Sequence, residues 1–340
     1  MDNVTHTLTG LALANAGLNR KTRFATLALV VGSNLPDIDV LWSMRSGADY
    51  LKYHRGITHS ILGAAVLAAL LAAVIYYFGR RARPRKKPGP PLNARWLGIL
   101  CLIALEGHVL MDFSNSYGVR LFEPFNSHWY AWDIMFVFDP LLLTMLFAGI
   151  AVPALFRLIS EEVGASKPGF RRGAVFSLSF LVLLWGVRDL AHRRVVQQLD
   201  SHVYGQQNPI QVGAFPTPAN PFEWVGVVET DTAYRVIPAS ALDSDVDIAH
   251  ARVFFKPEFS PALEAAENTR TGGIFLDFAR FPWANVSETE NGYEVTIRDL
   301  RFYSPTERRP GFIAEVVMNK QLKTVSQKFS FRGAAREAAN

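Results

Sequence analysis

Residues 57–79, "ITHSILGAAVLAALLAAVIYYFG", decide the fold of this chain. The stretch runs for more than 20 residues without an Asp, Glu, Lys or Arg. A helix rises about 1.5 Å per residue, so a helix of this length crosses a hydrocarbon core of about 30 Å. We therefore predict a transmembrane helix here.

Other long apolar stretches precede and follow this one. Three of them are long and two are shorter: 96–113, 134–159 and 173–187, then Val4–Leu18 and Phe24–Leu35. We predict an α-helical membrane domain over residues 1–195, with about four to six membrane-embedded helices. The N-terminus shows no charged leader and no small-residue cleavage site, so we expect no removable signal peptide.

Positive charge is concentrated in the segment 80–95, "RRARPRKKPGPPLNAR", directly after the 57–79 helix. The net charge of +5 is compatible with nucleic-acid binding, but a basic segment beside a span is typical of a cytoplasmic loop. We expect no nucleic-acid partner. With 80–95 in the cytoplasm, the 57–79 helix begins and the 96–113 helix ends on the external face. The basic segments 18–23 and 157–172 then fall in the cytoplasm.

Three arginines oppose this orientation. Arg188, Arg193 and Arg194 follow the last span on the side that we assign as external. Long downstream domains are translocated largely regardless of such charge. We therefore keep the orientation and expect an integral protein of the cytoplasmic (inner) membrane.

From about residue 200 the sequence changes to Pro and Asn turns and short alternating apolar stretches. Such stretches predict strands, and the Asn-Gly pair at 291–292 is typical of a hairpin. We predict a small, mostly β soluble domain over residues 196–340, on the external side. Its expected strands are 222–229, 234–237, 251–257, 273–281, 291–304 and 311–320.

Ionisable side chains lie at the ends of the apolar stretches in five places. Burying an unpaired charge in a membrane costs free energy, so we expect each of these side chains to have a pairing partner or a functional role. The first is His6, which could equally be a cap or an interface residue. The second is Asp37 with Asp39, after Pro36, which could also be a solvated loop or a helix cap.

Two histidine segments are more informative. His54 and His59 are five apart and share no helix face, so we expect them to converge from a loop and the first turn of the next helix. His108 and Asp112 are four apart and stack on one face, a spacing that suits two ligands of one metal. The alternative for His108 and Asp112 is a structural one, in which they lie at a capped helix end and the histidine has its hydrogen bonds within the protein.

The fifth place is "HWYAWDIMFVFDP", with His128, Asp133 and Asp139. Asp133 directly precedes an apolar stretch, so it is either a helix cap or a ligand. Asp139 is followed by Pro140, which favours a structural role. Cys101, the single cysteine, lies inside an apolar stretch and excludes both a disulfide within the chain and a thiolate cluster.

These residues share one side of the membrane. With the orientation above, eight of them fall at the external ends of their segments, and imidazole with carboxylate is the ligand set of zinc, manganese or iron. We therefore predict a divalent metal site at the external face, with zinc favoured. The candidate ligands are His6, Asp37, Asp39, His54, His59, His108, Asp112 and Asp133.

Four motifs in this order resemble those of a known family. "TH" near the start, "LPDID", "HRGITHS" and "GHVLMDFSNSYGVRLFEPF" together resemble the YdjM-type membrane-bound, metal-dependent hydrolases, which are similar to the zinc-dependent phospholipase C superfamily. The resemblance covers about residues 1–160. It implies metal ligation by six residues, with His54 a ligand or a neighbour of one: His6, Asp37, Asp39, His59, His108 and Asp112.

The chain departs from the superfamily at one point. The His-x-x-x-Glu pair that completes a multinuclear zinc site there has no counterpart here, because Trp132 follows His128 at that spacing. Asp133 is the candidate replacement.

Our leading hypothesis is hydrolysis of a phosphoester or other ester of a lipid or lipid-linked substrate, at two or three metal ions beside the bilayer. Asp37 or Asp39 would accept a proton from water, and Arg55 would clamp a phosphate or carboxylate. Two alternatives stay open: a non-catalytic metal-binding membrane module whose β domain engages a protein partner, and a transporter. The ligands of a transporter would line a path at mid-membrane, so ligands at the segment ends argue against a transporter.

Overall fold

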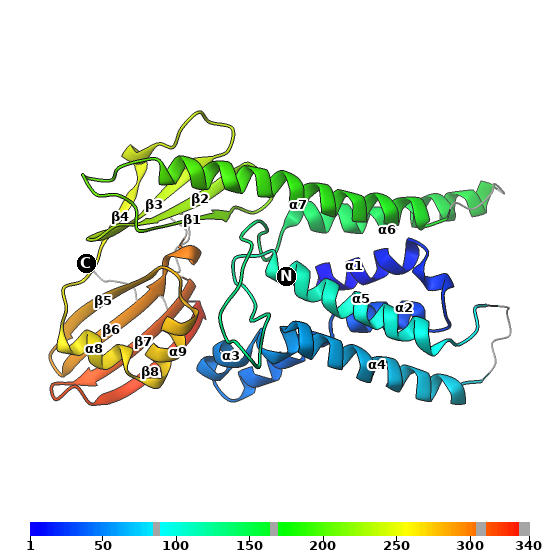
Figure 1. Ribbon diagram of the computed structural model, residues 1–340, viewed down its shortest axis with the longest axis horizontal. Helices are drawn as coiled ribbons and strands as arrows, with labels where there is room; N and C mark the ends of the chain where they lie inside the picture. Colours follow the sequence, from blue (N-terminus) through cyan, green and yellow to red (C-terminus); the bar gives the residue numbers. More distant parts are fainter. Residues whose placement is uncertain (84–88, 164–168, 304–310, 333–340) are drawn as a thin grey trace. The chain divides into compact units, whose positions relative to one another are not determined.

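The computed structural model describes residues 1–83, 89–163, 169–303 and 311–332. Its contacts divide the chain into two compact units (Figure 1). The helical unit comprises Met1–Asp39, Arg55–Ala191 and Pro216–Pro221, and the β unit comprises Val40–His54, His192–Phe215 and Phe222–Asn340. Parts of two predicted cytoplasmic loops, 84–88 and 164–168, lie outside the described residues.

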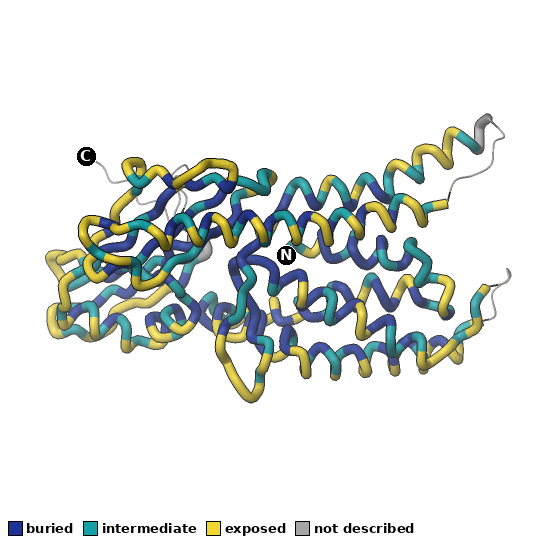
Figure 2. The backbone as a smooth tube through the Cα atoms, turned by 45° about the horizontal axis from the view of Figure 1, so that its top comes forward, coloured by how far each residue is buried: buried dark blue, intermediate teal, exposed yellow. Residues whose placement is uncertain are grey.

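Four of the described helices are long and apolar enough to cross a membrane: α4 (Ile61–Arg81), α5 (Ala94–Phe113), α6 (Pro140–Val163) and α7 (Arg171–Asp200). They coincide with the four long apolar stretches. The predicted fold class, a helical membrane part followed by a small domain of sheets, is confirmed. Each of these helices has a buried side and an exposed side, as expected for helices that face lipid (Figure 2).

The two shorter apolar stretches form α1 (Asn3–Asn15) and α2 (Ala25–Gly32). At about 1.5 Å per residue they are about 20 and 12 Å long, which is too short to span about 30 Å. Three 3₁₀ segments join the helices of this part of the chain: η1 (Leu18–Arg20), η2 (Leu35–Met44) and η3 (Ile57–His59).

Helices α4 and α5 pack through small residues. Alanines four residues apart on α4 meet larger side chains of α5, so the two helix axes approach closely. The alanines are Ala64, Ala68 and Ala72, and their α5 partners include Leu97, Cys101 and Leu105. Ser60 fixes the start of α4, since its hydroxyl accepts the Gly63 N–H at 2.9 Å.

Helices α6 and α7 also approach closely, at Gly149. A Cβ atom there would lie 2.8 Å from the Gly173 carbonyl oxygen, so only glycine fits. Farther along, Arg188 Nη2 donates to Asp139 Oδ2 at 2.6 Å, and both side chains are fully buried. Arg188, which we had counted as a positive charge at the external flank, is therefore neutralised inside the helical unit.

The predicted start of the third long helix is corrected by this structure. We expected the apolar stretch from residue 134 to be helical and Asp133 to be its cap or a ligand. Instead α6 begins at Pro140, and Asp139 caps it by accepting the Leu142 N–H at 3.0 Å. Residues 114–139 form an irregular loop in which Val119 and Tyr130 pair through their backbones.

The β unit holds two four-stranded antiparallel sheets (Figure 1). The first has the order β1 (Gln211–Pro216), β2 (Glu223–Glu229), β3 (Ala233–Ser240), β4 (Arg252–Phe255). The second has the order β5 (Pro282–Thr289), β6 (Gly292–Asp299), β7 (Gly311–Asn319), β8 (Thr324–Arg332). The hairpin expected at Asn291-Gly292 joins β5 to β6. The sequence did not indicate β1, β5 or β8.

Short helices complete the β unit: α3 (Gly47–Tyr53), η4 (Ile248–His250), α8 (Pro261–Glu267), α9 (Arg270–Phe278) and η5 (Leu300–Phe302). Arg270 of α9 forms an ion pair with Asp49 of α3. A hydrogen bond from Ser46, together with Arg270, lowers the pKa of Asp49 despite the opposing effect of burial.

The prediction of a strand at 273–281 is wrong, because most of this segment forms α9. Thr269 caps the helix by accepting the Gly272 N–H. The buried residues Thr271, Phe275 and Phe278 are spaced four and three apart, which is a helical period. A short run of apolar residues is compatible with both a strand and a helix. The capping threonine, Thr269, favours the helix.

Candidate metal centre

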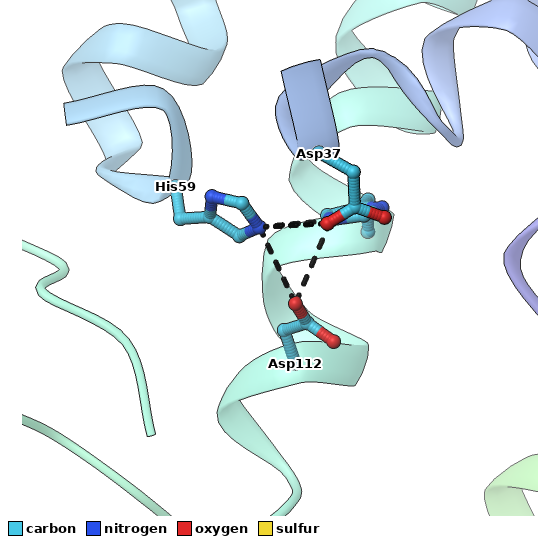
Figure 3. A group of neighbouring side chains, drawn as sticks. Asp37, His59 and Asp112 are labelled. Carbon is cyan, nitrogen blue, oxygen red and sulfur yellow. Dashed lines mark hydrogen bonds and ion pairs between the residues drawn. The ribbon is translucent and has the colours of Figure 1, made fainter. Parts of the chain in front are cut away.

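Four side chains of the helical unit bring ligand atoms together. They are Asp37 of η2, His59 of η3, and His108 and Asp112 of α5, and their ligand atoms all lie within 4.8 Å of one another. Asp37, His59 and Asp112 point toward a common centre (Figure 3). Three separate segments of the chain therefore meet at a group that could hold a metal ion.

Four of the five distances that involve an imidazole nitrogen are those expected around one tetrahedral ion, and the fifth, between the two imidazoles, is shorter. His59 Nε2 lies 3.1 Å from His108 Nε2, 3.3 Å from Asp112 Oδ2 and 3.5 Å from Asp37 Oδ1. His108 Nε2 lies 3.6 Å from each of the two carboxylate oxygens. Ligand atoms about 2.0 to 2.2 Å from a tetrahedral centre are about 3.3 to 3.6 Å apart.

The protonation of the two imidazoles also fits a cation. His108 Nδ1 lies 2.8 Å from the Ser33 carbonyl oxygen, which only accepts hydrogen bonds, so Nδ1 carries the proton. His59 Nδ1 lies 3.2 Å from Asp39 Oδ2, a carboxylate oxygen that likewise favours the proton on Nδ1. Both Nε2 atoms then present lone pairs to each other and to two carboxylates. Two imidazole lone pairs and two carboxylate oxygens form a donor set that suits a divalent cation, and Arg55 and the Met1 amino group also contact the Asp112 carboxylate.

Asp39 contacts the other side of His59. Its Oδ2 accepts the Arg55 N–H at 2.9 Å and the Thr58 hydroxyl at 3.0 Å. Asp39 is buried, with 4% of its surface exposed. Its carboxylate thus holds the His59 ring in place and lies outside the four-atom group.

The guanidinium group of Arg55 is surrounded by other side chains of the helical unit. Its Nε lies 3.0 Å from Asp112 Oδ2, and its Nη1 donates to Asn115 Oδ1 at 2.9 Å. Its guanidinium also lies over the Tyr117 ring. Arg55 has a φ of +56°, a left-handed conformation that is uncommon for a residue with a side chain.

His6 lies beside the group. Its Nε2 is 3.3 Å from Asp112 Oδ1, and its ring stacks on that of His108 with 3.8 Å between centroids. Burial lowers the pKa of His6 well below its usual value, so the imidazole is neutral. The amino group of Met1 also pairs with Asp112 Oδ1.

Asp37 differs from the other three residues of the group. Its side chain is 13% exposed, whereas those of His59, His108 and Asp112 are fully buried. Its Oδ2 is a buried atom and, like Asp112 Oδ2, has no hydrogen-bond partner in the described part of the chain. Burial alone raises the pKa of Asp37, but its contact with His59 outweighs this and the pKa falls to about 2. Asp37 is therefore ionised at neutral pH.

Two further candidate ligands lie elsewhere. His54 ends α3 in the β unit, and its ring stacks on that of Tyr50 with 4.4 Å between centroids. Asp133 is buried in the loop before α6 with a φ of +60°. Neither belongs to the four-atom group.

Sequence reasoning did not assign roles to Ser33, Thr58 and Asn115 in holding the ligands. Thr58 and Asn115 do lie within the motifs quoted above, but Thr58 suggested only a helix cap. The Ser33 contact uses a backbone carbonyl, for which a side-chain pattern carries no signal.

Comparison with known proteins agrees with the helical part of this description. Residues 1–195 match the family described as YdjM inner membrane protein, and residues 261–332 match the YfhP C-terminal alpha/beta plait domain. The chain is 26% identical over 319 residues to the uncharacterized protein YfhP of Bacillus subtilis (strain 168), covering 89% of this chain and 88% of that protein.

No solved structure matches the chain. These matches do not bear out the similarity to the zinc-dependent phospholipase C superfamily. The family match covers more than half of the chain, so the chain belongs to the YdjM inner membrane protein family and is an integral inner membrane protein.

Proposed function

We propose that this member of the YdjM family is a metal-dependent hydrolase, which cleaves a phosphoester or other ester of a lipid or lipid-linked substrate at the external membrane face. The unequal anchoring of the four ligand side chains carries this proposal. His59, His108 and Asp112 are fully buried and each contacts a residue outside the group, whereas the Asp37 side chain is 13% exposed.

Three fixed ligands and one accessible position are typical of a catalytic metal site. Two histidines and one carboxylate with an open fourth position recur in zinc hydrolases. We infer that His59, His108 and Asp112 are the fixed ligands and that Asp37 occupies the position open to solvent. Zinc is favoured, and manganese or iron accepts the same ligands.

The group accounts for one ion, fewer than the two or three that we expected from the sequence. His6, whose Nε2 lies 3.3 Å from Asp112 Oδ1, is the residue that could contribute to a second ion. Elemental analysis of the purified protein counts the ions directly.

The residues around the ion have separable tasks. A divalent ion held there would lower the pKa of a water molecule to about 7 and would neutralise charge that develops on a phosphoryl or acyl oxygen. Asp37 Oδ2 is our candidate for accepting the proton of that water, in preference to Asp39, which contacts His59 Nδ1. Arg55 orients Asp112 and is occupied by protein contacts, so we assign it positioning in place of a substrate clamp.

The position of the group along the helices supports a membrane substrate. His59 directly precedes α4, and His108 and Asp112 lie in the last two turns of α5. The basic segment 80–95 joins the opposite ends of these helices, which are cytoplasmic by the positive-inside rule. The metal centre is therefore on the external face in our proposal, level with lipid head groups.

The test compares two ligand variants. Wild-type protein, Asp37→Asn and Asp112→Asn are purified in detergent, analysed for metal and assayed on a panel of lipid phosphoesters and simple esters. We expect Asp112→Asn to lose the metal, and Asp37→Asn to keep it but to lose at least 100-fold in turnover, about 2.7 kcal/mol. Asp49→Asn, at a buried aspartate of the β unit, is the matched control and retains both.

Hydrolysis by Asp37→Asn at the wild-type rate would contradict the role of Asp37. Absence of a tightly bound divalent metal in the wild type would contradict the whole proposal.

The second candidate function is a non-catalytic metal-binding module whose β unit engages a protein partner. A group of four protein ligands favours it, because structural zinc sites are closed in this way. In that case Asp37→Asn and Asp112→Asn would lose metal and thermal stability to the same extent, and no substrate would turn over.

A further inference from the structure

The helix η2 has a second surface that takes no part in the metal centre. A 3₁₀ helix has three residues per turn, so residues three apart form one row. Ile38, Leu41 and Met44 form such a row and are 50, 58 and 83% exposed. Asp39, on a neighbouring row, is buried against His59. Val40, on the row of Asp37 and Ser43, is also exposed, at 51%. The helix therefore shows mainly apolar side chains to its surroundings and the Asp39 carboxylate to the protein.

The depth of η2 in the membrane can be inferred from the length of α4 and from the contact between η2 and His59. Helix α4 has 21 residues, about 32 Å, which matches a hydrocarbon core of about 30 Å. Its first residue, Ile61, therefore lies at the boundary of the core. His59 is two residues before it, and Asp37 Oδ1 lies 3.5 Å from His59 Nε2. The first turn of η2 thus lies at the same boundary.

Aromatic and basic side chains follow the apolar row. Trp42 stacks on Tyr53 with 4.4 Å between centroids. Arg45 lies over the Trp42 ring and Lys52 over the Tyr53 ring, at 5.5 and 5.3 Å. Tryptophan, tyrosine and basic residues are the side chains that collect at the level of lipid head groups.

We propose that η2 lies in the external membrane interface, with Ile38, Leu41 and Met44 among the outer ends of the lipid acyl chains. An amphipathic helix in this position buries its apolar side by a few ångströms and keeps its polar side in the head-group layer. Asp37 then faces the metal centre from the same helix that contacts lipid. This surface is independent of the reaction that the metal centre performs.

The sequence permits a direct test with spin labels. Cys101 is the only cysteine, so single cysteines are introduced into a Cys101→Ala background at Ile38, Leu41, Ser43 and Met44. Each variant is labelled with a nitroxide and reconstituted into vesicles of phosphatidylethanolamine and phosphatidylglycerol. Collision with oxygen, which is concentrated in the bilayer, is compared with collision with a water-soluble nickel chelate.

Two reference positions calibrate the ratio of oxygen to nickel collisions. Leu70→Cys, at an exposed position near the middle of α4, reports the hydrocarbon core. Glu290→Cys, in the turn between β5 and β6, reports water. Size-exclusion chromatography of each labelled variant confirms that the chain remains folded.

We expect a period of three. The ratio of oxygen to nickel collisions at Ile38, Leu41 and Met44 will be several-fold higher than at Ser43, and intermediate between the two references. Ratios at the three positions equal to those of Ser43 and Glu290 would overturn the proposal. Low collision rates with both reagents would overturn it too, since protein would then cover the row.

Discussion

Replacing Asp39 by asparagine tests whether the carboxylate behind His59 supports the metal centre. Asp39 Oδ2 lies 3.2 Å from His59 Nδ1, and the aspartate is 4% exposed. The asparagine keeps the volume but loses the charge that fixes the ring and increases the basicity of Nε2. A buried hydrogen bond to a charged group contributes about 1.5 to 3 kcal/mol. We therefore expect metal affinity to fall about 10- to 100-fold, as at comparable positions in other metal sites.

The assay is competition for Zn²⁺ between the detergent-solubilised protein and a chromogenic chelator. His59→Ala, which removes a ligand, sets the lower limit of affinity. Asp49→Asn changes a buried aspartate of the β unit and should leave affinity unchanged. Thr58→Val removes one of the groups that donate to Asp39, and we expect a loss smaller than that of Asp39→Asn.

Two results would refute this reasoning. If Asp39→Asn bound Zn²⁺ within twofold of the wild type, the contact with Nδ1 would contribute nothing to ligation. If it bound as weakly as His59→Ala while remaining folded, Asp39 would itself be a ligand, as the sequence suggested.

Three further predictions concern stability, each measured as a thermal midpoint in detergent. Arg188→Met leaves Asp139 as a buried charge without its partner and should destabilise the protein by about 3 to 5 kcal/mol. Arg188→Met combined with Asp139→Asn, which removes the charge and keeps a side chain able to cap α6, should recover part of the loss; equal midpoints for the single and double variants would refute this. Gly149→Leu should lower the midpoint by forcing α6 from α7, and an unchanged midpoint would show that the close approach is absent. The pKa of Asp49 is lower in the folded protein than in the unfolded chain. Its ionised carboxylate therefore stabilises the fold above the unfolded pKa of about 3.9, and this stabilisation is lost as pH falls through the folded pKa. Arg270→Gln should therefore lower the midpoint at pH 7 and lower it by less at pH 2.5, and a loss of equal size at both pH values would contradict the ion pair.

Hydropathy predicted the membrane helices well, because the long apolar stretches satisfy a length requirement set by the bilayer. The start of α6 was missed for a local reason. Asp133 and Asp139 both precede apolar residues, and only the backbone shows that the second one caps the helix. The strand expected at 273–281 failed similarly, since a short apolar run does not distinguish a strand from a helix.

The sequence was informative about the metal centre where ligands share one element. The spacing of His108 and Asp112 predicts a common helix face, and both belong to the four-atom group. The different tasks of Asp37 and Asp39 could not be predicted. They depend on the turn of η2, which directs one carboxylate to His59 Nε2 and the other to Nδ1.

The origin of the ligands has a consequence for biosynthesis. His59 enters at the start of α4, whereas His108 and Asp112 follow only at the end of α5. If either helix failed to insert, or inserted in reverse, these side chains would end on opposite sides of the bilayer. If the group holds a metal ion as we propose, loading would have to wait until both helices are in place, and metal content would measure correct insertion during protein production.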